Sequence, residues 1–210
     1  MVNNRKKMFF DGVLGGNIVL SGLMVISPVI ICSDTLKNAE ALIYAFSAIT
    51  FLAIIICSFV PKRLPYTAKV IIYAVISSLV YIPVKLAAQQ FYPESIARIG
   101  MYYPLLSVNS LIVFQTEAKF FRMKRAEMAV SLIFYIIGFD LVMLLTGFLR
   151  ELFAYGTINS KIVDVNTLIS GLSQPFGGFI FLGLMCGVYR AVRAAASKEG
   201  ARRNTDVSDQ

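Results

Sequence analysis

The sequence of 210 residues contains no histidine. Histidine is the commonest metal ligand and the usual proton shuttle near neutral pH, so its absence excludes histidine-ligated haem and serine–histidine catalysis. Cysteine is also scarce. Cys32, Cys57 and Cys186 lie inside or at the ends of apolar runs, without a C-x-x-C pair. An odd count argues against a disulfide framework, and we expect buried packing residues instead.

Charge is low as well, at 15% of residues, where soluble proteins carry about a quarter. Hydrophobic residues make up 57% of the chain, which is typical of a polytopic membrane protein. No long polar block interrupts the sequence. We therefore expect one membrane domain over residues 1–210 with no soluble catalytic domain, and any active site would lie within the membrane or be shared with partner chains.

Six apolar segments are long enough, or nearly long enough, to span a bilayer, which takes about 20 residues. They lie at about 14–33, 39–60, 68–88, 100–117, 128–149 and 167–192. Lys and Arg are distributed unequally over the loops that connect the six segments. Fourteen of the 20 fall on the same side of the membrane as the termini: Arg5, Lys6, Lys7, Lys62, Arg63, Lys119, Arg122, Lys124, Arg125, Arg190, Arg193, Lys198, Arg202 and Arg203. The positive-inside rule then predicts that both termini are cytoplasmic. The net charge of +8 reflects this topology and attraction to the anionic lipid bilayer, and needs no nucleic-acid partner.

The first and fourth segments are interrupted by polar residues and proline. Ser27 and Pro28 interrupt the first segment, and Pro104, Asn109 and Ser110 the fourth. Broken helices at membrane depth are tolerated where protein or a water-lined cavity satisfies the backbone. The alternative is a continuous helix with a proline kink.

Each interrupted segment opens a group of three spans, and three is odd, so the second group enters from the opposite face. This pattern predicts an all-α polytopic membrane protein of six transmembrane helices, arranged as two inverted three-helix repeats with broken first and fourth helices. The repeats would cover about 12–92 and 99–193, followed by a basic polar tail at 194–210. Paired broken helices predict a binding site near the midplane.

Polar side chains within the membrane are costly and are therefore functional candidates. Asp140 lies near the middle of the fifth segment, and we expect it to face the bundle interior, toward Ser27 and Asn109, rather than lipid. Glu117 and the Arg150–Glu151 pair lie at segment ends. Their alternative roles are a solvated helix end and a water-tolerant interfacial anchor.

Four sequence runs resemble signatures of the Rnf/Nqr integral membrane subunits. Gly100 to Asn109 with Glu117-Ala118 resembles G-x-x-x-P-L-x-x-V-N-C-x-x-x-x-x-x-E-A, and Gly147 to Ile158 resembles G-x-x-R-E-x-x-x-x-G-T-I. Pro175 to Gly183 resembles the closing P-x-G-A-F-I-x-L-G. Residues 11–20 resemble the D-G-x-x-x-x-N-P-V-L opening of the RnfE/NqrD branch. The runs follow one another in the family's order along nearly the whole chain.

This resemblance implies a six-span subunit of the bacterial inner membrane that pairs with an inverted sister subunit (RnfA/NqrE-like) and other Rnf/Nqr-type subunits. The complex would couple electron flow, from NADH to quinone or between ferredoxin and NAD, to translocation of Na⁺ or H⁺. The resemblance also implies a [2Fe–2S] cluster shared by the sister subunits, each of which gives two cysteines.

The chain departs from the family at the positions of both cysteines, which are Ser27 and Ser110 here. A serine hydroxyl does not replace the soft thiolate that selects Fe–S clusters. Cys32 is five residues beyond Ser27, about 7.5 Å along a helix. We therefore expect no cluster or metal ligands and no catalytic residue in this chain. The main interpretation is a divergent subunit of the redox complex, and the alternative is a stand-alone ion or small-solute transporter or channel without a redox role.

Overall fold

The computed structural model describes residues 13, 17, 19–20, 26–61, 63–108, 112, 123–159, 161–163 and 169–208, with the side chains of 26–28, 162, 170 and 196–208 left outside the description. Its helices and strands, in chain order, are α2 (Ile26–Cys32), α3 (Leu36–Cys57), α4 (Tyr66–Phe91), α5 (Pro93–Ile99), α6 (Tyr102–Leu105), the 3₁₀ helix η2 (Leu106–Val108), α8 (Arg125–Tyr155), β1 (Thr157–Ile158), β2 (Lys161–Ile162), the 3₁₀ helix η5 (Ser170–Ser173) and α9 (Pro175–Ser208).

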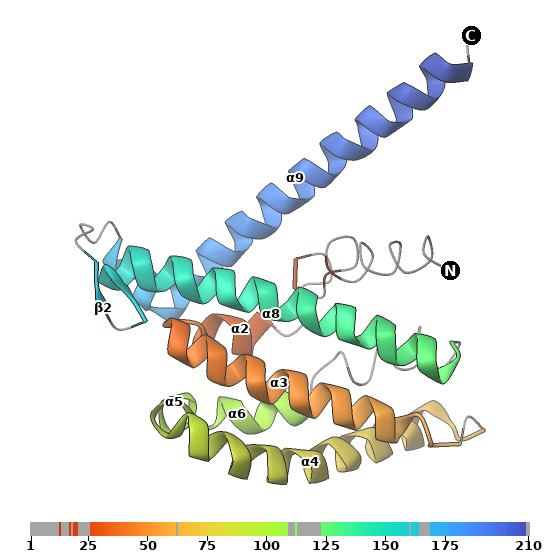
Figure 1. Ribbon diagram of the computed structural model, residues 1–210, viewed down its shortest axis with the longest axis vertical. Coiled ribbons are helices and arrows are strands. Elements are labelled where there is room, and N and C mark those ends of the chain that lie inside the picture. The colour runs from red at the N-terminus through yellow and green to blue at the C-terminus, as the bar shows by residue number, and fades with distance from the viewer. Residues whose placement is uncertain are drawn as a thin grey trace.

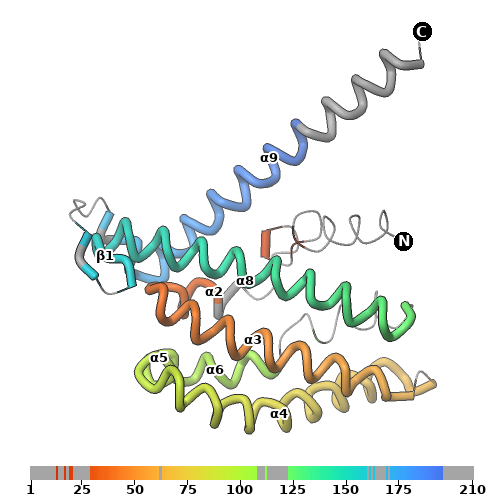
Figure 2. Tube along the Cα trace, viewed as in Figure 1, coloured from red at the N-terminus to blue at the C-terminus, as the bar shows by residue number. Residues whose placement is uncertain are grey.

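Within the described residues, four helices are long and apolar enough to cross a membrane: α3, α4, α8 and the part of α9 from Pro175 to Ala195. The helix α3 lies between α4 and α8 and runs antiparallel to both (Figure 1). The helix α9 leaves the end of α8 and runs at a steep angle away from the other three (Figure 2). The predicted all-α polytopic membrane fold is confirmed, and the antiparallel hairpin of β1 and β2 is a small addition to it.

The described parts of the two interrupted segments form short helices. In the first, Asn17 has no regular structure, Val19–Leu20 form a turn, and α2 covers Ile26–Cys32. In the fourth, the α-helix ends at Leu105, one residue after Pro104, and continues as η2. Over these described residues, neither segment forms one continuous α-helix.

The short helices pack against the long ones. Among the described elements, α2 precedes the long helices α3 and α4, and α6 with η2 precedes α8 and α9. The short helices α2 and α6 contact each other, α2 packs on α9, and η2 packs on α4. The long helices α3 and α8 also pack together. The described parts of the two interrupted segments are thus held by long helices and by each other, while the inverted repeat stays a prediction.

Local sequence explains where the long helices begin and end. Thr35 caps α3 by accepting a hydrogen bond from the Asn38 amide. The helix α8 ends at Gly156, which has φ of 63°, a left-handed conformation that favours glycine. Gln174 is extended, as residues before proline prefer, and α9 begins at Pro175.

These boundaries differ from the prediction at the sixth span. The sequence predicts a start at about residue 167 with a break at Gln174–Gly178, whereas the helix begins at Pro175, directly after η5. Proline lacks an amide hydrogen and suits a first helical turn, so it sets a boundary here rather than an internal kink. The helix then continues through the predicted polar tail to Ser208.

The packing of α3 against α8 forms one part of the core, which also contains buried residues of α4 such as Tyr73. The rings of Phe46 and Phe139 stack with centroids 3.7 Å apart. Further along the interface, a Cβ added at Gly147 would lie 2.8 Å from the Cβ of Ala39, so glycine there allows the two helices to approach closely. The packing of α3 on α8 therefore determines where the polar side chains of α8 lie relative to α3.

Candidate functional site

Arg150 is buried near the end of α8, with 1% of its surface exposed. Its Nε donates to the carbonyl of Leu172 in η5 at 3.1 Å. Its Nη1 donates to the carbonyl of Ile30 in α2 and to the Ser33 hydroxyl, the latter at 3.3 Å. The last carbonyls of a helix lack partners within the helix, and Ile30 is among these in α2. One guanidinium thus joins α8, α2 and η5.

Two consecutive glycines give the guanidinium and η5 room beside α9. A Cβ added at Gly178 would lie 3.0 Å from the Arg150 Cζ and 2.8 Å from the Ile30 Cγ2. A Cβ added at Gly177 would meet the backbone of η5, including the Leu172 Cα at 2.9 Å. The Pro-Phe-Gly-Gly sequence therefore starts α9 and also lets it pack against both groups that Arg150 joins.

Glu151 is buried beside Arg150, with 2% of its surface exposed. Its Oε2 accepts a hydrogen bond from the backbone amide of Leu36 at 2.7 Å, and its Oε1 accepts one from the Thr157 hydroxyl at 3.0 Å. The amide of Leu36 belongs to the first turn of α3, where backbone donors lack helical partners and a negative charge is favourable. Glu151 thus caps α3 from a distant part of the chain.

The surroundings of Arg150 and Glu151 are not those of side chains open to solvent, because both are buried. Their partners are backbone groups and hydroxyls of α2, η5, α3 and β1. The pair therefore orders the ends of several elements around the broken segment α2. Its functional role stays a prediction.

Asp140 is half-buried midway along α8. The Ser47 hydroxyl of α3 lies 3.0 Å from both of its carboxylate oxygens and donates its hydrogen between them. The carboxyl group thus lies at the interface of α3 and α8. The predicted approach to Ser27 and Asn109 stays a prediction, since neither of those side chains is described.

Asn17 is a polar residue that our sequence-based site does not include, although its interruption of the first segment is visible in the sequence. It is 2% exposed, and its Nδ2 donates to the Gly138 carbonyl of α8 at 2.8 Å. Its Oδ1 accepts from the amides of Val19 and Leu20. The signal in the sequence that could have identified it is an amide side chain inside an apolar run. Asn17 stabilises the irregular backbone and attaches it to α8, two residues from Asp140.

Four of the predicted site residues are placed only in part or not at all. The backbone of Ser27 lies in the first turn of α2, while Asn109, Ser110 and Glu117 lie outside the described residues. Over the described part of the chain, no three His, Cys, Asp or Glu side chains group as a metal site would require. Cys32 lies at the opposite end of α2 from Ser27 and is buried.

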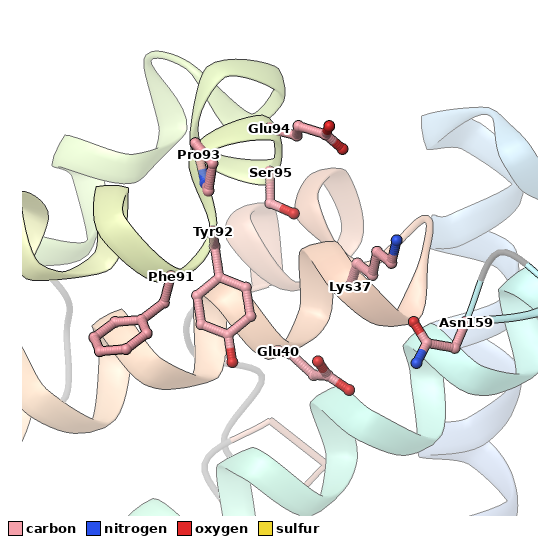
Figure 3. Close-up of a pocket in the computed structure, with 8 residues that line it drawn as sticks. All are labelled: Lys37, Glu40, Phe91, Tyr92, Pro93, Glu94, Ser95 and Asn159. Carbon is pink, nitrogen blue, oxygen red and sulfur yellow. The ribbon is translucent and has the colours of Figure 1, made fainter.

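A polar pocket of about 440 Å³ lies at the end of the bundle where α3 begins and α4 ends. Lys37, Glu40 and Asn159 turn toward one space, with Glu94 and Ser95 of α5 beside it (Figure 3). Charges of both signs meet there, and Arg98 of α5 pairs with Asp34 at 3.2 Å. This end of α3 therefore has the character of a water-facing surface, in contrast to the interface around Asp140.

Comparison with known proteins gives consistent matches over both halves. The model of a family described as "Rnf-Nqr subunit, membrane protein" matches residues 5–186. A membrane-family relative from Pseudoalteromonas translucida, one of the subunits of its Na⁺-translocating NADH-quinone reductase, is 25% identical over 90% of this chain and 93% of that protein. A subunit of the ion-translocating oxidoreductase complex of Glaesserella parasuis is 25% identical, over 87% of this chain and 86% of that protein. Its counterpart from Shewanella loihica is 26% identical, over 89% and 87%.

Proposed function

Because the chain belongs to the Rnf-Nqr family of membrane subunits, we propose that it is a membrane subunit of a redox-driven, ion-translocating electron transport complex. The observation that carries this proposal is the family match over residues 5–186, which includes both broken segments. The relatives' names attach subunits of this kind to ion-translocating oxidoreductases. Na⁺ or H⁺ is the ion that such a complex would move.

The polar contacts support a role in shaping the broken segments rather than in bond chemistry. Arg150 fixes the carbonyl end of α2, Glu151 fixes the start of α3, and Asn17 fixes the irregular backbone before α2. Asp140 with Ser47 adds a polar group at mid-depth. Transporters use interrupted helices near the midplane to bind substrates and ions, and carboxyl groups within membrane spans mark ion and proton pathways.

We further propose that this chain supplies no ligands to the cluster that its family implies. The backbone of Ser27 opens α2, where the family has a thiolate, and Cys32 lies at the other end of that helix. The [2Fe–2S] group would supply one-electron transfer where it is bound. The residues of this chain would then serve assembly and ion movement.

The expected partners are an inverted sister membrane subunit of the RnfA/NqrE type and further subunits of the same complex. The expected location is the bacterial inner membrane with both termini in the cytoplasm, because fourteen of the 20 Lys and Arg lie on the side of the termini. A C-terminal reporter that is active only on the outer side of the membrane would contradict this topology.

The test is purification of the tagged chain from its native membranes in mild detergent, followed by identification of the proteins that accompany it. Co-purification in fixed proportion with flavin- and ferredoxin-like subunits is the expected result. Deletion of the gene should abolish ion uptake driven by NADH or reduced ferredoxin in membrane vesicles. A chain that purifies alone, with vesicle transport unchanged by the deletion, would instead support the stand-alone transporter.

A further inference from the structure

The interface of α3 and α8 is hollowed on one side into a groove of about 400 Å³. We call this the seam groove, and define it by its lining residues: Ile43, Tyr44, Ser47, Ala48, Phe51, Ile133, Ile136 and Ile137. Ser47 is the polar member of this lining. Both helices are candidate membrane spans, so the groove is set at a depth where the surroundings are either lipid or another membrane helix.

Asp140 extends the α8 wall of the seam groove by one turn. It follows Ile136 and Ile137 at the spacing of four and three residues that places side chains on one helix face. Its carboxyl group hydrogen-bonds Ser47 of the groove lining. A carboxylate has about four lone-pair sites, and one serine hydroxyl supplies a single hydrogen. Most of its acceptor capacity is unused by the described residues.

The depth of Asp140 prevents it from reaching water along the helix. It stands halfway along α8. The middle of a hydrocarbon core about 30 Å thick is about 15 Å from either edge, and the side chain of an aspartate is too short to extend to a headgroup from there. Lipid tails offer no hydrogen-bond donor, and helical backbone amides are already used within their own helix. A groove filled by lipid would therefore leave the carboxyl group poorly satisfied.

We propose that the seam groove seats a membrane-spanning helix of another subunit, and that this helix presents a hydrogen-bond donor or a cation to Asp140. The occupant follows from charge complementarity. A protein helix can supply the Asp140 carboxyl group with a hydrogen-bond donor in addition to the Ser47 hydroxyl, whereas lipid tails cannot. A second copy of this chain placed groove to groove would bring two Asp140 carboxyl groups together, and like charges there repel. The proposal rests on the proposed function, since it requires a complex with other membrane subunits.

The first experiment places a photo-crosslinking amino acid at Ile137 in the complete complex. Ile137 is a groove residue with 41% of its surface exposed, and Leu79 on α4, with 62% exposed, is the matched control. We expect the Ile137 probe to join a membrane helix of another subunit, within one turn of a donor side chain. The Leu79 probe should give at least severalfold less of that adduct.

The second experiment compares two substitutions of the carboxyl group in the same complex. Asp140→Asn keeps an acceptor oxygen but loses the negative charge, so it should retain the partner subunit better than Asp140→Leu does. Asp140→Leu removes every hydrogen-bonding atom of the side chain and should weaken retention by roughly tenfold, the effect of losing one interhelical hydrogen bond in a membrane. Size-exclusion chromatography of each variant checks that it remains folded, and the Ile137 probe tests the groove without changing Asp140.

Three outcomes overturn the proposal: an Ile137 probe that reacts only with lipid in an intact complex, one that joins a second copy of this chain, and an Asp140→Leu variant that retains its partner like wild type. These outcomes leave the proposed function standing. A wild-type chain that brings down no other membrane subunit would instead contradict both the proposed function and this inference.

Discussion

The Nε of Arg150 donates to the carbonyl oxygen of Leu172 at 3.1 Å, and the same guanidinium reaches the carbonyl of Ile30, 120 positions earlier in the chain. A side chain of α8 thereby holds the short helix α2. Because α2 has only seven residues, it gains little stability from its own hydrogen bonds. Its position depends on contacts such as these.

Replacement of Arg150 by lysine should destabilise the protein despite the retained charge. An ammonium group lacks the planar fork of donors that serves two carbonyls in different directions, so one of them would be left without a partner. We expect a loss of about 1–3 kcal/mol in the free energy of unfolding, measured by SDS titration from mild-detergent micelles. Arg98→Lys is the matched control, because Arg98 is itself largely exposed in its ion pair with Asp34, and ion pairs at the surface contribute about 0–1 kcal/mol. Equal stability of the two variants would contradict the role assigned to Arg150.

Alanine at Gly177 should be more harmful than alanine at Gly178. The added Cβ at Gly177 meets backbone atoms of η5, which cannot move aside, whereas the neighbours of Gly178 are the side chains of Ile30 and Arg150. Overpacking of this kind costs about 1–3 kcal/mol, and thermal unfolding in detergent measures it. Gly183→Ala is the control, since a Cβ there meets no atom within 4 Å. A Gly177→Ala variant as stable as Gly183→Ala would argue against the close approach of α9 and η5.

Removal of the Glu151 carboxylate should loosen the first turn of α3. Glu151→Ala leaves the Leu36 amide without its acceptor, and loss of a helix cap costs about 0.5–2 kcal/mol. Hydrogen exchange at residues 36–39 should accelerate in the variant, while exchange in the middle of α3 changes little. The matched control is Glu94→Ala at an exposed position of α5, and unchanged exchange at the start of α3 would rule out the capping role.

The sequence was sufficient to predict the fold class, which depends on composition, and the end of the α-helix near Pro104, which depends on proline within an apolar run. Hydrophobicity determines which segments insert, and this is a local property. The prediction of where the sixth span starts was less accurate. Proline within an apolar run fits an internal break as well as the first turn of a helix, and Pro175 occupies a first turn.

Contacts between distant residues could not be read from the sequence. The pairing of Asp140 with Ser47 spans 93 positions, and that of Glu151 with Leu36 spans 115. Both arise from the packing of α8 on α3, which neither segment specifies alone. Arg150 and Glu151 were visible as costly charges, yet their burial depends on η5, a short element without a periodic pattern. Asn17 was visible as an interruption, but its partner in α8 was not.

Iron content tests the consequence of the two serines. A thiolate binds iron in [2Fe–2S] clusters and a serine hydroxyl does not replace it, so we expect no stoichiometric iron or acid-labile sulfide bound by this chain alone or by its wild-type complex at the Ser27 and Ser110 positions. Joint replacement by Ser27→Cys and Ser110→Cys, in the presence of the sister subunit, should introduce the visible absorption of a [2Fe–2S] centre. Neither single substitution should do so, because each gives only one of the two thiolates that this chain would contribute. Two irons per pair of sister subunits in the wild-type complex would show that other residues serve as ligands, and the role of Cys32 would then be tested first by Cys32→Ser.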